Sequence, residues 1–336
     1  LAITSTSATG VDDLLLNGSN VSASRDLSLS VTDGEVKLIE GELYAGNNLD
    51  LTASVLSDSS TSANTRYADG NNSFTTTYIA PYCDGESQNC INISSANIDG
   101  SVWGAGKALS GDVVNFKIGS NGADLYAGTT LDLSSTEALN LGAAAIYSVG
   151  DMALTSDGYF STNEGPSQGI QTTEGDLTLT ARSIYNRGTI SADAGNLIAR
   201  VDYGINNSNT GTLHAGTTLD IASLSNSWSS TINNYGTMVT EGDFIAQAYT
   251  FNNRADANIR ATTGTTLTAN SLVNDSTFIA SDTHGQTGTF TLASLENNST
   301  LQATGNLEFN VSDTLDNTGD LLATNNLSIN ANTSVL

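Results

Sequence analysis

Short stretches of alternating apolar and polar residues run through most of this chain. Examples are Leu49-Asp-Leu51, Leu131-Asp-Leu133 and Leu219-Asp-Ile221. Alternation places every second side chain on one face of a strand, and that face must be buried. Asn and Gly, which favour tight turns, bound these runs. The pattern therefore predicts many short β-strands joined by polar turns, and it does not predict helices.

One unit recurs along the sequence: an apolar residue, then Ala-Gly, then alternating apolar positions. It begins at Leu43 as Leu-Tyr-Ala-Gly-Asn-Asn-Leu-Asp-Leu and returns, with Thr-Thr in place of Asn-Asn, from Leu125 and Leu213. Most turn glycines are spaced 20 to 26 residues apart. A unit of about 20 residues has too few apolar side chains for its own core, so it must stack on its neighbours.

Such stacking predicts an all-β fold, a right-handed, single-stranded parallel β-helix (solenoid) whose coils pair about 4.8 Å apart. Asn recurs before the turns, as in Ile205-Asn-Asn207 and Phe251-Asn-Asn253, and Asn at one corner of successive coils can form a ladder of amides. An antiparallel sandwich or a propeller also uses short strands. The period favours the β-helix, because sandwiches do not repeat in sequence and propeller blades repeat at about 40 to 50 residues.

The repeat is interrupted in its first half, so we expect β-helix coils over 1–56, an irregular insertion over 57–122 and further coils over 123–336. The insertion contains Cys83 and Cys90, the two cysteines of the chain. A polar, glycine-containing loop separates them, and their spacing is not Cys-x-x-Cys. This arrangement favours a disulfide over a metal or redox pair, and a disulfide indicates an oxidising compartment.

Aromatic residues are denser in the insertion than in the regular coils, and two interpretations compete. Insertions in solenoids commonly emerge on the binding face, and aromatic side chains supply much of the contact energy at interfaces. Alternatively, the insertion packs against the helix and its aromatic side chains are simply buried. On the first interpretation the candidate receptor-contact residues are Tyr67, Phe74, Tyr78, Tyr82 and Trp103.

The charge balance is strongly acidic, with 35 Asp and Glu against 10 Lys and Arg and a net charge of −25. Nucleic-acid binding requires clustered basic residues, so the composition argues against it. No apolar run approaches the roughly 20 residues of a transmembrane helix, so we expect no membrane span. A high net charge also keeps a long chain soluble.

Motifs for catalysis, cofactors and metals are scarce. Asp50, Asp132 and Asp220 each follow a Leu within a strand and are best explained as outward neighbours of buried residues. The calcium-binding nonapeptide, the EF-hand loop and nucleotide-binding glycine loops are absent, and His214 and His284 are isolated in the sequence. We expect no enzymatic activity, cofactor or metal. A polysaccharide lyase is the enzymatic alternative, because distant coils can bring carboxylates together.

The repeats resemble those of filamentous haemagglutinins and of the CdiA-type effectors of contact-dependent growth inhibition, large exoproteins of Gram-negative bacteria exported by two-partner secretion. The resemblance rests on Leu-x-Ala-Gly-x-x-Leu-x-Leu-x-Ala preceded by Asn-Asn, over about residues 125–336 and 21–53. It implies an interior rod segment of a secreted, cell-surface exoprotein with an outer-membrane secretion partner. The secretion-domain motif Asn-Pro-Asn-Gly is not found, which fits an interior fragment.

Two functions of different kinds follow from the resemblance. In contact-dependent growth inhibition, the rod would present a receptor-binding region to an outer-membrane receptor on a target bacterium and so help deliver a distant toxin. In an adhesin, it would bind a ligand on host cells or in their matrix. The interrupted, cysteine-bearing region favours the first.

Overall fold

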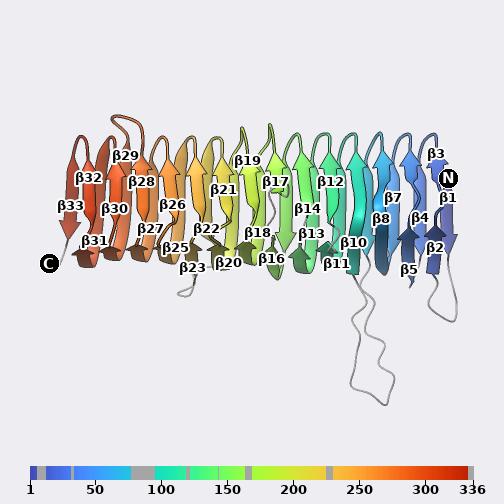
Figure 1. The fold of residues 1–336 in the computed structure, drawn as a ribbon, viewed down its shortest axis with the longest axis horizontal. Coiled ribbons are helices and arrows are strands. Elements are labelled where there is room, and N and C mark those ends of the chain that lie inside the picture. Colours follow the sequence, from blue (N-terminus) through green and yellow to red (C-terminus); the bar gives the residue numbers. More distant parts are fainter. Residues whose placement is uncertain are drawn as a thin grey trace, which may run out of the picture. The chain divides into compact units, whose positions relative to one another are not determined.

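The computed structural model describes residues 1–5, 13–31, 34–76, 95–118, 122–142, 144–162, 169–224 and 230–331. Every regular element in these ranges is a β-strand, and the strands pair in parallel into a β-solenoid of about 13 turns (Figure 1). The predicted parallel β-helix is therefore confirmed. No helix in the described ranges is long and apolar enough to cross a membrane.

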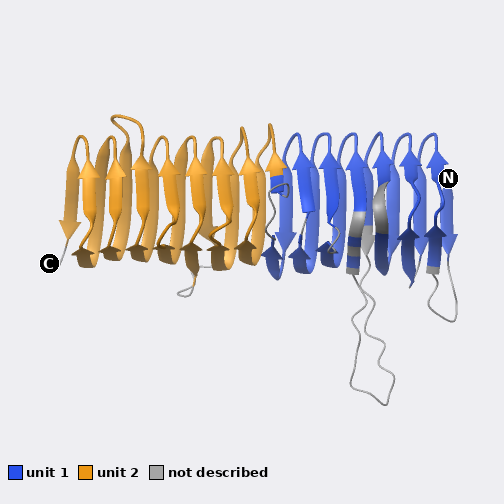
Figure 2. Ribbon diagram, in the orientation of Figure 1, with its two compact units in different colours: residues 1–170 blue, residues 171–336 orange. Residues whose placement is uncertain are grey.

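The chain divides into two compact units, residues 1–170 and 171–336 (Figure 2). The strands of unit 1 are β1 (Ala2–Ser5), β2 (Asp13–Asn17), β3 (Val21–Ala23), β4 (Leu27–Val31), β5 (Glu35–Ile39), β6 (Leu43–Ala45), β7 (Leu49–Ala53), β8 (Val55–Ala68), β9 (Asn72–Thr76), β10 (Ser95–Ala105), β11 (Leu109–Ile118), β12 (Ala123–Ala127), β13 (Leu131–Asn140), β14 (Ala144–Ser148), β15 (Met152–Ser156) and β16 (Tyr159–Ser161). Strand β17 (Gly169–Thr172) contains the division. The strands of unit 2 are β18 (Leu177–Asn186), β19 (Thr189–Ala192), β20 (Leu197–Asn207), β21 (Thr212–Ala215), β22 (Thr218–Ser223), β23 (Thr231–Asn234), β24 (Thr237–Thr240), β25 (Asp243–Asn253), β26 (Asn258–Ala261), β27 (Thr265–Asn274), β28 (Thr277–Ser281), β29 (Thr287–Asn297), β30 (Thr300–Ala303), β31 (Asn306–Asn317), β32 (Asp320–Ala323) and β33 (Leu327–Ala331).

Each coil carries its strands in a fixed order, and each residue pairs with its equivalent one coil further on. In unit 1, β4 pairs with β7 so that Leu27 lies opposite Leu49, and β6 pairs with β8 so that Tyr44 lies opposite Tyr67. The alternation of apolar and polar residues in the sequence corresponds to an alternation of buried and less buried side chains along each strand. Leu27 and Leu29 are fully buried, and Ser28 between them is half-buried. The core therefore lies inside the coils.

A ladder of asparagine amides runs through unit 2. Each side chain except the last donates from Nδ2 to Oδ1 of the next asparagine, with N–O distances of 2.6 to 3.1 Å. The ladder comprises Asn186, Asn207, Asn234, Asn253, Asn274, Asn297 and Asn317. The second hydrogen of the amide reaches a backbone carbonyl, as from Asn253 to Thr277 at 3.2 Å. The predicted laddering of Asn at one corner is confirmed for these residues.

Regular coils extend into the segment that the sequence marked as irregular. Strands β8 and β10 pair in parallel, so that Arg66 lies between Leu43 of the preceding coil and Trp103 of the following one. Residues 57–76 and 95–118 thus form coils, which differs from the irregular insertion expected over 57–122. The predicted Cys83–Cys90 disulfide, together with Tyr78 and Tyr82, lies outside the described residues.

Candidate functional site

Four tyrosines of unit 1 occupy the same outward position in neighbouring coils. From each coil to the next along the chain, Tyr44 pairs with Tyr67 and Tyr67 with Gly104. Gly104 in turn pairs with Tyr126, and Tyr126 with Tyr147. Tyr44 and Tyr126 are 41% and 39% exposed, and Tyr67 and Tyr147 are half-buried. We call these four residues the tyrosine row; Gly104 occupies its central position.

Strand alternation directs these side chains outward. Each tyrosine stands between two buried positions, as Tyr126 does between Leu125 and Ala127. Neighbouring rings are then close enough to interact across the strands. The rings of Tyr126 and Tyr147 are nearly parallel, 4° apart with centroids 5.5 Å apart, and those of Tyr44 and Tyr67 stack at 6.3 Å and 15°. The row therefore consists of two stacked pairs.

Gly104 separates the two pairs. A Cβ atom added at Gly104 would lie 3.0 Å from Cδ2 of Tyr67, so the Tyr67 ring overlies this glycine. Because glycine has no side chain, it places no group of its own between Tyr67 and Tyr126. Tyr126 accordingly has a stacked neighbour, Tyr147, on the side away from Gly104.

Carboxylates lie along both margins of the row. Asp124 is exposed and stands two positions before Tyr126 in β12, hence on the same strand face, about 6.6 Å along the strand. Glu42, just before β6, is also exposed. Beyond the strand, Asp69 accepts a hydrogen bond from the Tyr44 hydroxyl at 2.6 Å, and this bond raises the pKa of Tyr44. Lys107 is exposed on the turn after β10. The surface is thus aromatic with mainly acidic margins.

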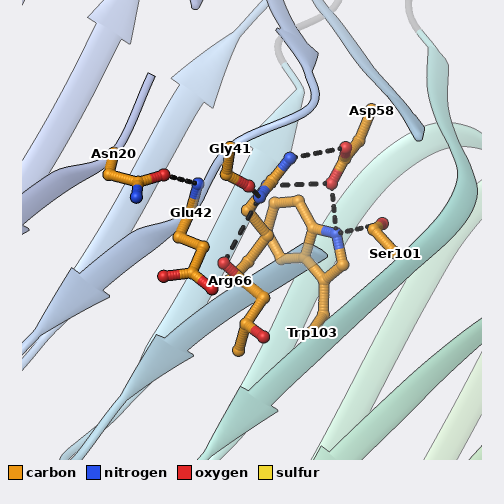
Figure 3. A network of polar contacts seen from close by, with 8 residues as sticks. Asn20, Gly41, Glu42, Asp58, Arg66, Ser101 and Trp103 are labelled. Atoms are coloured by element: carbon orange, nitrogen blue, oxygen red, sulfur yellow. Dashed lines mark hydrogen bonds and ion pairs between the residues drawn. The ribbon is translucent and has the colours of Figure 1, made fainter. Parts of the chain in front are cut away.

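A buried polar network is centred on Arg66, the residue before Tyr67 (Figure 3). Arg66 points inward, and its Nε and Nη2 atoms donate to the two carboxylate oxygens of Asp58 at 3.1 and 3.0 Å. Its Nη1 donates to the Gly41 carbonyl at 2.6 Å. The Trp103 indole completes the network, with Nε1 donating to Asp58 Oδ2 at 2.8 Å.

Asp58 and Arg66 stand at positions that hold apolar residues in adjacent coils. Asp58 lies in register between Leu38 and Ile98, and Arg66 follows Leu43 in its own column. Burial raises the pKa of Asp58, while the Arg66 charge and the hydrogen bonds oppose the rise. Both side chains are at most 1% exposed, so the pair cannot touch an external ligand and acts on the structure of the coil.

The expected contact residues fall into three groups. Tyr67 belongs to the exposed row. Phe74 and Trp103 are 1% and 0% exposed and pack edge to face with centroids 5.3 Å apart. As interior residues they are unavailable for contact with another cell, so for these two the alternative of simple burial holds. Tyr78 and Tyr82 fall outside the described ranges.

Sequence reasoning missed Tyr44, Tyr126 and Tyr147 as candidates. The signal was present in the repeat itself, because Tyr follows the first Leu of the unit at Leu43 and again at Leu125. Aligned coils bring equal positions of a repeat into one column on the surface. Aligning the units by coil position would have assembled the row.

The acidic and histidine residues considered for chemistry have separate local surroundings. Asp50 and Asp132 are exposed, and Asp220 forms an ion pair with Arg200. His214 lies with Nδ1 3.0 Å from the Ser191 hydroxyl oxygen. Within the ranges that the structure describes, no group of three or more His, Cys, Asp or Glu residues could hold a metal ion.

The tyrosine row offers chemistry for binding. Its ring faces suit apolar and cationic groups, and its hydroxyls and neighbouring carboxylates form hydrogen bonds. Comparison of the chain with protein-family models, with curated proteins and with solved structures found no match in any of the three. The proposed function therefore rests on the fold, on this surface and on the pattern of the repeats.

Proposed function

We propose that this chain is a segment of a secreted, cell-surface exoprotein that presents a receptor-binding surface to a target cell. The observation that carries the proposal is the tyrosine row, exposed on a regular parallel β-solenoid. Tyrosine is enriched at protein interfaces because it combines a large apolar ring with a polar tip. Exposed aromatic patches on a regular scaffold are typical of interaction sites.

The fold supports this role. Coils repeat at the strand spacing, so side chains at one position form a rigid, evenly spaced array, and rigid elements hold binding groups more accurately than loops. Right-handed winding belongs to the proposal, because parallel crossover connections are right-handed in about 98% of cases. The Cys83–Cys90 disulfide also belongs to it and would accord with an extracellular setting.

We place this binding event in contact-dependent growth inhibition between Gram-negative bacteria. The basis is the resemblance of the Leu-x-Ala-Gly repeats to those of such effectors, which also implies an outer-membrane secretion partner and an outer-membrane receptor on the target. A host-cell or matrix adhesin would use the same surface. The kind of cell that the surface binds separates the two functions.

Binding of the fluorescently labelled full chain to Gram-negative bacteria and to epithelial cells tests the proposal. The test variant is Tyr126→Leu with Tyr147→Leu, which removes one stacked pair. We expect it to weaken binding to bacteria about tenfold, the usual effect of losing an aromatic contact at the centre of an interface. The control is Tyr185→Leu, because Tyr185 is 49% exposed and lies in unit 2.

Two results would count against the proposal. Equal binding of the row variant and the unaltered chain would remove the tyrosine row as the receptor-contact surface. Row-dependent binding to epithelial cells without binding to bacteria would replace the bacterial target with a host ligand. Matching circular dichroism spectra of the variants would show that neither result arises from unfolding.

A further inference from the structure

We infer that the partner of the tyrosine row is a protein segment that places a Lys or Arg side chain against Tyr126, beside the Asp124 carboxylate. This inference rests on the proposed function, since it names the chemistry of the receptor that the row would bind. It is carried by two features of unit 1: the one-sided stacking of Tyr126 beside the coil of Gly104, and the carboxylate on the margin of the row.

The first feature is the one-sided stacking of Tyr126. Parallel stacking on Tyr147, at 4° and 5.5 Å, covers one face of the Tyr126 ring. On the opposite side lies the coil that holds Gly104, which pairs with Tyr126 and has no side chain of its own. The Tyr67 ring overlies Gly104, and this glycine is buried. In the described part of the chain, Tyr147 is the ring partner of Tyr126. Tyr126 is nevertheless 39% exposed, so an incoming group can reach the part of its ring that Tyr147 does not cover.

The second feature is the carboxylate beside that face. Asp124 precedes Tyr126 by two positions and projects from the same side of β12, about 6.6 Å away along the strand. Its side chain is exposed, and across the described ranges no ion pair engages it. Glu42 is a second exposed carboxylate, two residues before Tyr44 and just outside β6. An aromatic face and a carboxylate outside any ion pair thus lie together on β12.

Charge complementarity then selects the occupant. A Lys ammonium or Arg guanidinium is attracted to the face of a tyrosine ring and also to a neighbouring carboxylate. A chain with 35 acidic and 10 basic residues attracts a cationic partner from a distance and repels an anionic one. A neutral sugar would contact the ring but would gain no ion pairing from Asp124. Lys107 is the basic residue on the next turn, and among the described residues no cation–π contact joins it to Tyr126.

The probe for this inference is a short glycine peptide carrying two lysines, with acetylated and amidated ends. A glutamine version and a neutral cello-oligosaccharide serve as comparison ligands, all titrated calorimetrically into the full chain. We expect Tyr126→Leu, which leaves the net charge unchanged, to weaken lysine-peptide binding about three- to fivefold. Tyr126→Phe keeps the ring and should retain binding, and Asp124→Asn should weaken it similarly to Tyr126→Leu.

The matched controls are Asp132→Asn, which removes another exposed carboxylate of unit 1, and Tyr185→Leu in unit 2. Both should leave peptide binding within about twofold of the unaltered chain. Equal losses in Asp124→Asn and Asp132→Asn, with no loss in Tyr126→Leu, would mean general attraction to an acidic surface and would overturn the inference. Tighter binding of the oligosaccharide than of the lysine peptide would also overturn it, in favour of a glycan.

The cell assay separates this inference from the proposed function. If Tyr126→Leu lowers binding to bacteria and the lysine peptide competes with that binding, both are supported. If the variant lowers cell binding but the peptide neither binds nor competes, the cationic partner is excluded and the proposed function stands. If the double variant Tyr126→Leu with Tyr147→Leu leaves cell binding unchanged, the proposed function fails and the inference fails with it.

Discussion

Arg66 and Asp58 form an ion pair inside a coil of unit 1, with Arg66 Nη2 3.0 Å from Asp58 Oδ1 and neither side chain more than 1% exposed. The pair couples three coils, because Arg66 also donates to the Gly41 carbonyl and Asp58 also accepts from Trp103. Both charges occupy columns that are apolar in neighbouring coils. A shift of one residue would face them outward and move every neighbouring side chain to the opposite face.

The first prediction concerns the loss of one partner of this pair. Arg66→Leu leaves Asp58 buried without its charge partner and should lower the free energy of unfolding by about 3 to 5 kcal/mol. The double variant with Asp58→Leu removes both charges and should unfold at or above the urea midpoint of the unaltered chain, since Trp103 Nε1 keeps the Ser101 hydroxyl at 3.2 Å. In a Trp228→Phe background, tryptophan fluorescence reports Trp103 alone.

Arg260→Leu is the comparison variant for this prediction. The ion pair of Arg260 with Asp282 is about 40% exposed on both sides, so its loss should cost less than about 1 kcal/mol by circular dichroism. If the double variant were as unstable as Arg66→Leu alone, the loss of stability in Arg66→Leu could not be attributed to the unpaired charge of Asp58.

The second prediction concerns pH. Burial raises the pKa of Asp58, so the folded state favours the protonated acid more than the unfolded state does. Its stabilising contribution is complete below the unfolded pKa of about 3.9 and is lost as the pH rises through the folded pKa. The unaltered chain should therefore gain stability relative to Asp58→Asn as the pH falls from about 7 toward about 4. Urea unfolding of both chains across this range measures the difference, and a gain in the opposite direction would reverse the assigned pKa shift.

The third prediction concerns the asparagine ladder of unit 2. Asn253 accepts a hydrogen bond from Asn234 at 3.1 Å and donates to Asn274 at 2.8 Å. Asn253→Ala leaves buried amide groups on both neighbours without this partner and should cost about 2 to 3 kcal/mol in thermal or urea unfolding. Asn298→Ala, which removes an amide with exposed hydrogen bonds, should cost no more than about 0.5 kcal/mol. Equal losses would show that the buried ladder has no special role in stability.

The fourth prediction concerns the packing of Phe74 against Gly111. A Cβ atom at Gly111 would overlap the Phe74 ring, since Cε2 and Cζ lie only 2.3 Å from it. Gly111→Ala should therefore destabilise unit 1 by about 1 to 3 kcal/mol through overpacking. Adding Phe74→Leu should recover part of the loss, because a smaller side chain leaves room for the new methyl group.

Gly104→Ala is the matched glycine variant, because there the new atom meets Tyr67, a half-buried surface side chain, at 3.0 Å. It should cost less than Gly111→Ala. Strict additivity of Gly111→Ala and Phe74→Leu in unfolding experiments would mean that the two side chains do not share this space, and that Phe74 packs elsewhere.

The Leu-Asp-Leu alternation predicted that Leu131 and Leu219 are buried and that the acids beside them point outward. The structure confirms both predictions. The same reasoning failed at the coil of β8 and β9. Asp58, Arg66 and Asn72 replace apolar residues there, since Asn72 lies in register between Leu49 and Leu109. A coil with polar residues at core positions lacks the hydrophobic alternation that predicts a strand. The sequence pattern therefore predicts an interruption of the repeat there.

The sequence by itself determined that short strands repeat and stack in parallel, because alternation and period follow from the residues of each unit and their nearest neighbours along the chain. Only the tertiary structure decided which aromatic side chains are exposed. Tyr67 faces outward while Phe74 and Trp103 lie inside, and the register between coils that are distant in sequence brings Tyr126 onto Tyr147. That register depends on packing and pairing across coils, which no local stretch of residues encodes.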